Sequence, residues 1–292
     1  MAPLENRTNR PNFFVIGASR SGTTRLHYLL GLHTEVFMPE NKEPDYFVRS
    51  NPSPETYKQY FELFNEANNA KAIGESSTIY SRSQRWPGTA QRIFNYNPQA
   101  KLIYMVRHPL RRLESCWVES RARYNPTPAN FCEAIRSNII DSMDATLYWK
   151  QLSQYRPYFP DSQILLLFFE DFIRDEPATL KRCFEFLGVN SNASIDCSTQ
   201  ERQNASIGKQ EAKPFLDIMR RVPNYSRLRL LIPRSLKAKL RPNLLRPIQT
   251  KPTWDEETLH WAIEQLQDDT HQFLSHAEKL TTFWQWDPSP NT

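Results

Sequence analysis

The sequence lacks a hydrophobic run long enough to span a membrane. Its longest unbroken apolar segment, Ile164 to Phe169, is far shorter than the roughly 20 residues that a transmembrane helix needs. Residues Met1 to Asn12 also lack the apolar core of a signal peptide. We therefore expect a soluble protein that stays where it is made, with a cytoplasmic location.

Cysteine is also scarce. The four cysteines show no paired spacing of the metal-binding kind, and so few in a chain of 292 residues provide no disulfide framework. They are Cys116, Cys132, Cys183 and Cys197. Reduced thiols are the default expectation, and no metal site is predicted.

Acidic residues are missing from one stretch, 219–251, which contains ten lysines and arginines. The formal net charge of +5 is therefore local, because the rest of the chain is acidic on balance. Leucines are interleaved with the charges, so contact with an anionic membrane, or guidance of a lipid-like or acidic acceptor, is one interpretation. Prolines 233, 242 and 247 interrupt the stretch, and a variable lid or surface insertion is the other interpretation.

The most informative stretch runs from Phe13 to Leu30. Four apolar residues, Phe13 to Ile16, predict a buried parallel strand, and leucines at 26, 29 and 30 predict a helix with one buried face. The turn between them, Gly17 to Thr24, has glycines where the backbone must approach a ligand closely. Backbone N–H groups and the positive end of the helix dipole would converge there, so we predict an anion site.

The turn nearly matches the nucleoside-triphosphate loop G-x-x-x-x-G-K-[ST], but Thr23 stands where that motif has lysine. The basic residue is instead Arg20. Because phosphoryl transfer relies on the lysine and a magnesium ion, an ordinary kinase or ATPase is disfavoured. The turn resembles the 5′-phosphosulfate-binding loop of sulfotransferases that use 3′-phosphoadenosine 5′-phosphosulfate (PAPS).

Two later segments extend the resemblance. Lys42 to Phe47 is similar to the family's K-E-x-x-[FY]-F segment, which implies that Glu43 is the catalytic base that takes the proton of the attacking hydroxyl. A solvated Lys-Glu pair in a loop is the alternative. Ala72 to Tyr80 resembles the segment G-E-x-[ST]-x-x-Y, a strand end whose polar residues face the cleft. Glu75 there either holds an active-site group by a hydrogen bond or is a buried carboxylate satisfied by nearby backbone.

A third segment, Lys101 to Pro109, predicts a strand that ends in Arg107, with a helix after it. Arg107 and Ser115, eight residues on, resemble the family's 3′-phosphate-binding signature. A guanidinium and a hydroxyl suit a phosphate dianion. His108 is a weaker candidate for a base, because the residue beside this arginine varies in such segments.

These patterns predict an α/β fold, P-loop-like and three-layered, with a central, mainly parallel sheet flanked by helices and its ligand at the carboxyl ends of the strands. Gln163 to Phe172 is expected to be a central strand. Glu170 and Asp171 at its end are expected to have a structural role, capping or bracing, and not a catalytic one. Tyr148 to Phe159 is expected to be a helix. We expect one domain over 1–292, with the basic insertion at about 219–251 and a C-terminal helix at about 255–281.

The resemblance implies a PAPS-dependent sulfotransferase that modifies a hydroxyl, or less favourably an amine, of a small-molecule, sugar or lipid acceptor and releases PAP. The 5′-phosphosulfate would be held by Arg20, Ser21, Gly22, Thr23 and Thr24, and the 3′-phosphate by Arg107 and Ser115, without a metal or a nucleic-acid partner. A P-loop-like nucleotide kinase and a non-catalytic anion- or membrane-binding module are the alternatives. The sequence identifies neither the acceptor nor the oligomeric state.

Overall fold

The computed structural model describes residues 9–68, 70–122, 127–137, 142–193, 195, 210–212, 245–247 and 251–286. The chain divides into two compact units. The first comprises Met1–Pro109, Asp144–Gln203 and Leu266–Gln285, and the second comprises Leu110–Met143, Asn204–Gln265 and Trp286–Thr292. The single domain expected from the sequence therefore stays a prediction.

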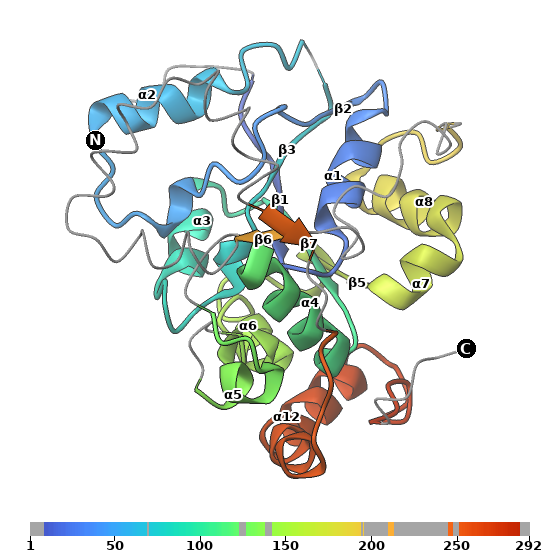
Figure 1. The fold of residues 1–292 in the computed structure, drawn as a ribbon. Helices are drawn as coiled ribbons and strands as arrows, with labels where there is room; N and C mark the ends of the chain where they lie inside the picture. The colour runs from blue at the N-terminus through green and yellow to red at the C-terminus, as the bar shows by residue number, and fades with distance from the viewer. Residues whose placement is uncertain are drawn as a thin grey trace, which may run out of the picture. The chain divides into compact units, whose positions relative to one another are not determined.

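The first unit is built on a five-stranded sheet with the order β2-β3-β1-β4-β5 (Figure 1). Its strands are β1 (Phe13–Gly17), β2 (Val36–Phe37), β3 (Ala72–Ser76), β4 (Lys101–Val106) and β5 (Ile164–Phe168). All neighbouring strands pair in parallel. The predicted α/β fold with a parallel sheet is confirmed, and the carboxyl ends of the strands share one edge.

Helices cover both faces of this sheet, and the alternation of side chains along β1 explains why. Phe13 and Val15 belong to one apolar core, and Phe14 and Ile16 belong to the other. The first core is completed by α1 (Thr23–Gly31), α7 (Phe169–Arg174) and α8 (Glu176–Leu187). The second is completed by α2 (Pro54–Glu62), α3 (Thr89–Tyr96), α6 (Tyr148–Ser153) and the last part of α12 (Glu256–His276). The predicted three layers are therefore present in this unit.

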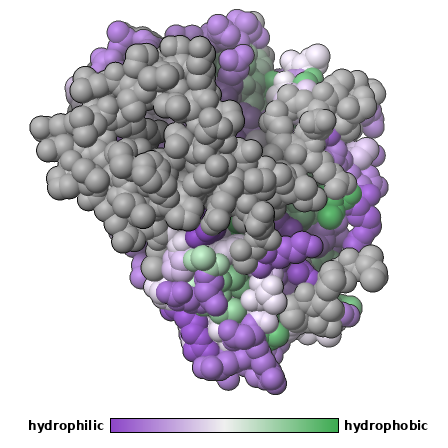
Figure 2. All heavy atoms as spheres, viewed as in Figure 1, coloured by the Kyte–Doolittle hydropathy of each residue, from purple (hydrophilic) through white to green (hydrophobic). Residues whose placement is uncertain are grey.

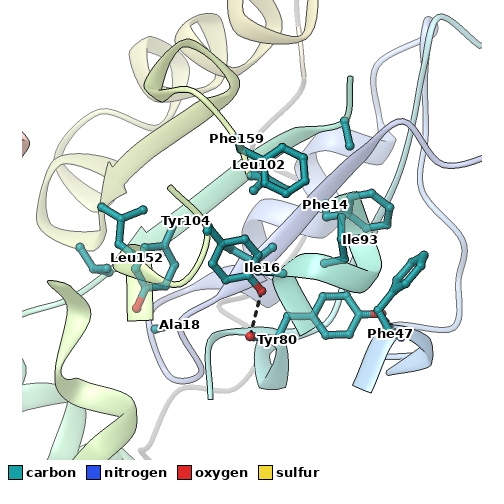
Figure 3. Close-up of a cluster of buried hydrophobic side chains, with 14 of the residues drawn as sticks. Phe14, Ile16, Ala18, Phe47, Tyr80, Ile93, Leu102, Tyr104, Leu152 and Phe159 are labelled. Atoms are coloured by element: carbon teal, nitrogen blue, oxygen red, sulfur yellow. Dashed lines mark hydrogen bonds between the residues drawn. The ribbon is translucent and has the colours of Figure 1, made fainter. Parts of the chain in front are cut away.

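The second core is rich in aromatic rings. Figure 3 shows Tyr80 among Phe14, Phe47 and Ile93, with its ring directed toward Phe47. The ring centroids of Phe47 and Tyr80 lie 6.1 Å apart in an edge-to-face arrangement, as aromatic pairs prefer. In the described parts of the chain, four short 3₁₀ helices connect the main elements: η1 (Tyr46–Val48), η2 (Thr78–Ser81), η3 (Asp144–Thr146) and η4 (Asp161–Gln163).

Two expectations about elements of this unit were wrong. The apolar run from Gln163 to Phe172 is not a central strand: β5 lies at the edge of the sheet and ends at Phe168, where α7 begins. The hydrophobicity of β5 arises because helices cover both of its faces, and this does not require a neighbouring strand on each side. The helix expected over Tyr148 to Phe159 ends at Ser153 and continues as turns.

The second unit contains α4 (Pro109–Ala122), α5 (Phe131–Arg136), the first part of α12, and the antiparallel pair β6 (Gln210–Ala212) and β7 (Leu245–Pro247). Trp254 joins its helices: the ring contacts Phe131 edge-to-face at 4.7 Å, and Nε1 donates to Glu114 Oε1 at 3.0 Å. The basic insertion lies outside the described residues except for 245–247 and Lys251. The helix expected at about 255–281 is α12, which ends at His276.

The exposed side chains of the described residues are mostly polar. Figure 2 shows a mainly hydrophilic surface in the described parts of this face, including the exposed side of α12. Among the residues that the structure describes, four large hydrophobic side chains are exposed, at separate positions in the sequence: Leu32, Tyr57, Ile173 and Leu280. Within the described ranges, no helix combines the length and apolar character needed to cross a membrane.

Candidate functional site

The loop between β1 and α1 requires glycine at two positions because other chain segments approach it closely. A Cβ on Gly17 would collide with Ser81 Oγ, and a Cβ on Gly22 would lie 2.8 Å from Cδ2 of Phe169. Gly22 also has φ +88°, in the left-handed region, and it forms the N-cap of α1. The glycine spacing seen in the sequence is therefore a steric requirement of this turn.

The N-terminus of α1 has features that suit an anion. Among the described residues no side chain caps this end, and its first turn contains no acidic residue. Ser21 is fully buried, and its Oγ has no hydrogen-bond partner among the described residues. Leaving a buried hydroxyl unsatisfied costs about 1–3 kcal/mol. Together with the helix dipole, this hydroxyl makes an arrangement that can bind an anionic oxygen.

Arg20 lies in the same turn with φ +68°. For a residue with a Cβ, the left-handed conformation costs about 1–2 kcal/mol, so the surrounding structure must hold it. A second arginine, which the sequence did not single out, reaches the loop: Arg82 Nη2 donates to Ser19 Oγ at 3.2 Å. Its only sequence signal is its position just after the G-E-x-[ST]-x-x-Y segment.

Arg107 and Gly22 contact the same aromatic ring. The Arg107 guanidinium carbon lies 4.6 Å from the centroid of the Phe169 ring, which is also the ring that leaves no room for a Cβ on Gly22. Tyr148 Oη donates to the Arg107 carbonyl at 2.6 Å and fixes the end of β4. Phe169 was missed in the sequence because it continues the apolar run of β5.

His108 and Glu170 brace the end of β4. Glu170 Oε1 accepts from the His108 backbone N–H at 2.9 Å, and Oε2 accepts from Trp284 Nε1 at 3.2 Å. His108 Nε2 donates to the Gln285 carbonyl at 2.6 Å, so this ring nitrogen serves a structural bond. The bracing role predicted for Glu170 is confirmed, and Asp171 acts similarly by accepting from Lys279 Nζ at 2.8 Å.

Glu43 is attached to the carboxyl end of β3. Its backbone N–H donates to the Ser76 carbonyl at 2.9 Å, and its Oε1 accepts from Lys42 Nζ at 2.7 Å and from Thr78 Oγ1 at 3.0 Å. Glu43 has φ +63° and Asp45 has φ +54°. The carboxylate is thus oriented by two donors, and 35% of its side chain is exposed.

Two further carboxyl groups near Glu43 have raised pKa values. Burial raises the pKa of Asp45 to about 6, and the negative charge of Glu43 adds to this effect. Burial raises the pKa of Glu75 to about 8, although Tyr80 Oη donates to its Oε1 at 2.6 Å. Glu75 is fully buried in the aromatic core, in agreement with one of the two roles considered for it, and its Oε1 accepts from the Tyr80 hydroxyl. This shift favours the protonated form of Glu75 near pH 7.

A neutral histidine connects α1 to this region. Burial lowers the pKa of His27 to about 4. Its Nε2 donates to the Pro39 carbonyl at 3.0 Å, and its Nδ1 accepts from Ser76 Oγ at 2.9 Å. His27 therefore joins the loop before Lys42 and the end of β3 to α1, the helix that follows the β1–α1 turn.

The strand order explains why the segments found in the sequence meet. β1 lies between β3 and β4, and the Ser77 backbone N–H donates to the Val15 carbonyl at 3.1 Å. The turn after β1, the Glu43 segment bonded to β3, and Arg107 after β4 therefore share one sheet edge. Open parallel sheets bind ligands at this edge, where the connections diverge to opposite sides.

Ser115 belongs to the second unit, where it lies on α4 with 6% of its surface exposed. Its pairing with Arg107 at one phosphate stays a prediction. The part of the chain that the structure describes contains no group of three or more histidine, cysteine, aspartate or glutamate side chains arranged to hold a metal ion.

Comparison with known proteins identifies a family. Residues 10–214 match the sulfotransferase domain. Among curated proteins, the chain is 39% identical over 103 residues to the membrane-associated sulfotransferase kil1 of Dictyostelium discoideum, covering 35% of this chain and 21% of that protein. It is 24% identical over 209 residues to the human bifunctional heparan sulfate N-deacetylase/N-sulfotransferase 2, covering 61% of this chain and 22% of that protein.

A mouse relative and a solved structure are also similar. The chain is 26% identical over 189 residues to heparan sulfate glucosamine 3-O-sulfotransferase 6 of Mus musculus, covering 63% of this chain and 54% of that protein. A crystal structure of a sulfotransferase from Alicyclobacillus acidocaldarius superposes with a TM-score of 0.56 at 26% identity, covering 80% of this chain and 92% of the other. The chain spans between a fifth and about half of the length of these curated relatives.

Proposed function

The chain belongs to the sulfotransferase domain family, and from this premise we propose that it transfers a sulfuryl group from PAPS to a hydroxyl group of an acceptor and releases PAP. One observation supports this most strongly: the buried hydroxyl of Ser21 lacks a partner among the described residues at the uncapped N-terminus of α1. That arrangement fits a phosphosulfate, and the glycine at 22 keeps the approach open.

The residues of the anion-binding turn have distinct roles in this proposal. The backbone N–H groups of Ser21, Gly22, Thr23 and Thr24 hold the 5′-phosphosulfate, and Arg20 provides a positive charge beside it. Such donors stabilise the charge that develops on the bridging oxygen as the sulfur–oxygen bond breaks. PAPS, when bound, supplies the sulfuryl group. Arg107 holds the 3′-phosphate, and Ser115 is the second donor expected from the sequence.

Glu43 takes the proton of the attacking hydroxyl in this mechanism. A carboxylate that is partly exposed and held by Lys42 and Thr78 can receive a proton from a bound acceptor. We favour a hydroxyl over an amine because a hydroxyl must lose its proton as it attacks. The acceptor class is a small molecule, a sugar or a lipid, and nucleic acid is not expected.

The location and the surroundings of the enzyme belong to the same proposal. The cytoplasmic location inferred from the sequence is retained as a prediction. Peripheral contact with an anionic membrane through 219–251 is a further proposal, and the name of the Dictyostelium relative describes that protein as membrane-associated.

Thermal unfolding with different nucleotides tests the proposed co-substrate. PAP should raise the melting temperature, whereas AMP and ADP, which lack the 3′-phosphate, should raise it much less. A nucleotide kinase would be stabilised by ADP at least as strongly as by PAP, and an anion-binding module without a nucleotide site would respond to neither. Either of those results would contradict the proposal.

A further inference from the structure

Two segments that the sequence separates by about thirty residues hold each other by several hydrogen bonds. The first contains Glu43 and runs to Phe47, and the second runs from Glu75 to Tyr80. Four bonds join them: Glu43 N–H to the Ser76 carbonyl at 2.9 Å, Thr78 Oγ1 to Glu43 Oε1 at 3.0 Å, Asp45 N–H to Ser77 Oγ at 3.1 Å, and Phe47 N–H to Tyr80 Oη at 3.2 Å. The second segment is therefore the support on which the first is folded.

Tyr80 forms the innermost of these contacts. Its hydroxyl accepts from the Phe47 backbone and donates to Glu75 Oε1 at 2.6 Å. Tyr80 is 1% exposed, and its own carbonyl accepts from Tyr155 Oη at 2.9 Å, so the residue is fixed at both ends. The Tyr80 hydroxyl has one proton, which it donates to Glu75. Because Glu75 fixes the direction of this proton, a lone pair of the Tyr80 oxygen points toward the Phe47 backbone N–H.

The segment from Glu43 to Phe47 has a backbone conformation that other contacts must stabilise. Glu43 and Asp45 both have positive φ, at a cost of about 1–2 kcal/mol each for residues with a Cβ. Such conformations persist only where neighbouring contacts determine them. Placing a carboxyl group in an aromatic core is also unfavourable, and Glu75 is fully buried there. Packing alone gives no reason for a carboxyl group at this position.

We propose that Glu75 is a positioning residue: through the Tyr80 hydroxyl it fixes the Phe47 backbone, and thereby the left-handed turn that presents the Glu43 carboxylate to the acceptor. Glu75 does not contact the reacting atoms. This inference rests on the proposed function of Glu43 as the base.

Three variants of the full chain separate this role from ordinary packing. Tyr80→Phe removes both hydrogen bonds, Glu75→Leu removes the acceptor, and Glu75→Gln retains an oxygen that can accept from Tyr80. Tyr96→Phe is the matched control, because Tyr96 also packs on Phe47 but its hydroxyl donates to the Pro11 carbonyl, away from the Glu43 segment.

The first readout is hydrogen–deuterium exchange of the peptide that covers residues 43–48. Exchange should rise in Tyr80→Phe and in Glu75→Leu and remain near wild type in Glu75→Gln and in Tyr96→Phe. The second readout is turnover, measured as PAP formed from PAPS with a metabolite extract as the acceptor source. Tyr80→Phe and Glu75→Leu should lower kcat about ten- to a hundredfold, as for a misplaced catalytic group, without weakening PAP binding.

Several results would overturn the proposal. These are unchanged exchange at 43–48 in Tyr80→Phe, equal losses of kcat in Tyr80→Phe and Tyr96→Phe, or failure of Glu75→Gln to retain the activity that Glu75→Leu loses. If wild type forms no PAP from PAPS, the proposed function fails. The exchange measurement still decides whether Glu75 holds the turn, because it needs no activity.

Discussion

At the scale of single residues, both proposed catalytic side chains belong to residues with left-handed backbone. Arg20 has φ +68° and Glu43 has φ +63°. Strain of this kind is retained where the surrounding structure fixes it, and it gathers at functional sites. It therefore supports the assignment of these two residues independently of the sequence motifs that first indicated them.

Glu43→Gln should reduce turnover by roughly 10²–10⁴, the usual contribution of a positioned general base, with PAP affinity nearly unchanged. The substitution is almost isosteric, so Thr78 retains an oxygen acceptor. Steady-state kinetics and calorimetry measure the two effects. Glu40→Gln is the control in the same loop, because Glu40 is exposed. Turnover within a few-fold of wild type would place the base elsewhere.

Arg107→Ala should weaken PAP binding far more than binding of adenosine 5′-phosphosulfate, which lacks the 3′-phosphate. A charge-assisted hydrogen bond contributes about 1.5–3 kcal/mol, so the selective loss should be about ten- to a hundredfold by calorimetry. Arg156→Ala, which removes a surface partner of Asp161, is the control. Equal losses for the two ligands would exclude Arg107 from the 3′-phosphate site.

Glu75 should make the fold less stable as the pH rises. Its ordinary pKa of 4.5 is raised to about 8 by burial, so between these values the folded state keeps a proton that the unfolded state has lost. The free energy of unfolding therefore falls across this range. Glu75→Gln removes the effect, and its melting temperature should increasingly exceed that of wild type from pH 6 to pH 8.

Asp45 also lowers the free energy of unfolding as the pH rises, but this effect ends near pH 6, where its raised pKa lies. A change above pH 6 therefore reports Glu75. The three tyrosines that face Glu75 stay protonated there, because burial raises their pKa values as well; they are Tyr60, Tyr80 and Tyr96. A constant difference between Glu75→Gln and wild type over pH 6–8 would show that Glu75 does not titrate in this range.

The β1–α1 turn and Arg107 stand out in the sequence because each follows a strongly apolar strand, and Glu43 stands out by the resemblance of its segment to the family's K-E-x-x-[FY]-F. The partners were not predictable in the same way. Thr78, Phe169 and Arg82 reach the candidate site through the order of strands in the sheet, which spacing along the chain does not reveal. The burial of Glu75 likewise depends on aromatic residues from α2 and α3.

At the scale of elements, the β1–α1 turn depends on its glycines. Gly22→Ala should abolish most PAP-dependent thermal stabilisation, since the added methyl group meets Phe169 and the residue must keep a positive φ. Gly31→Ala is the control, because a Cβ at this end of α1 has ordinary space beside Met38. Equal PAP responses of the two variants would contradict the steric account of the turn.

The elements themselves were largely predictable. Short apolar runs identified β1 and β4, and helical spacing identified α1, α8 and α12. The position of β5 was not predictable, because an edge strand covered by helices on both faces is as apolar as a central one. The hydrophobicity of a strand shows that helices cover both of its faces, but it does not show how many strands lie beside it.

At the scale of the whole molecule, charge is concentrated in 219–251, which carries ten basic residues and no acidic ones. Each basic residue near an anionic bilayer contributes about 1 kcal/mol, and salt screens the attraction. The protein should therefore sediment with anionic but not neutral vesicles and be released by a few hundred millimolar salt. If it stays in the supernatant with both vesicle types at low salt, the stretch is a lid or a solvated insertion.

The central claim is that this chain moves a sulfuryl group from PAPS to an acceptor hydroxyl. The most direct test incubates the protein with PAPS labelled in the sulfuryl group and a metabolite extract, followed by mass spectrometry. The account predicts a product that has gained one labelled sulfuryl group, formed together with PAP and lost in Glu43→Gln. If PAP-binding protein yields no labelled product from any extract, or if Glu43→Gln yields as much as wild type, the account is contradicted.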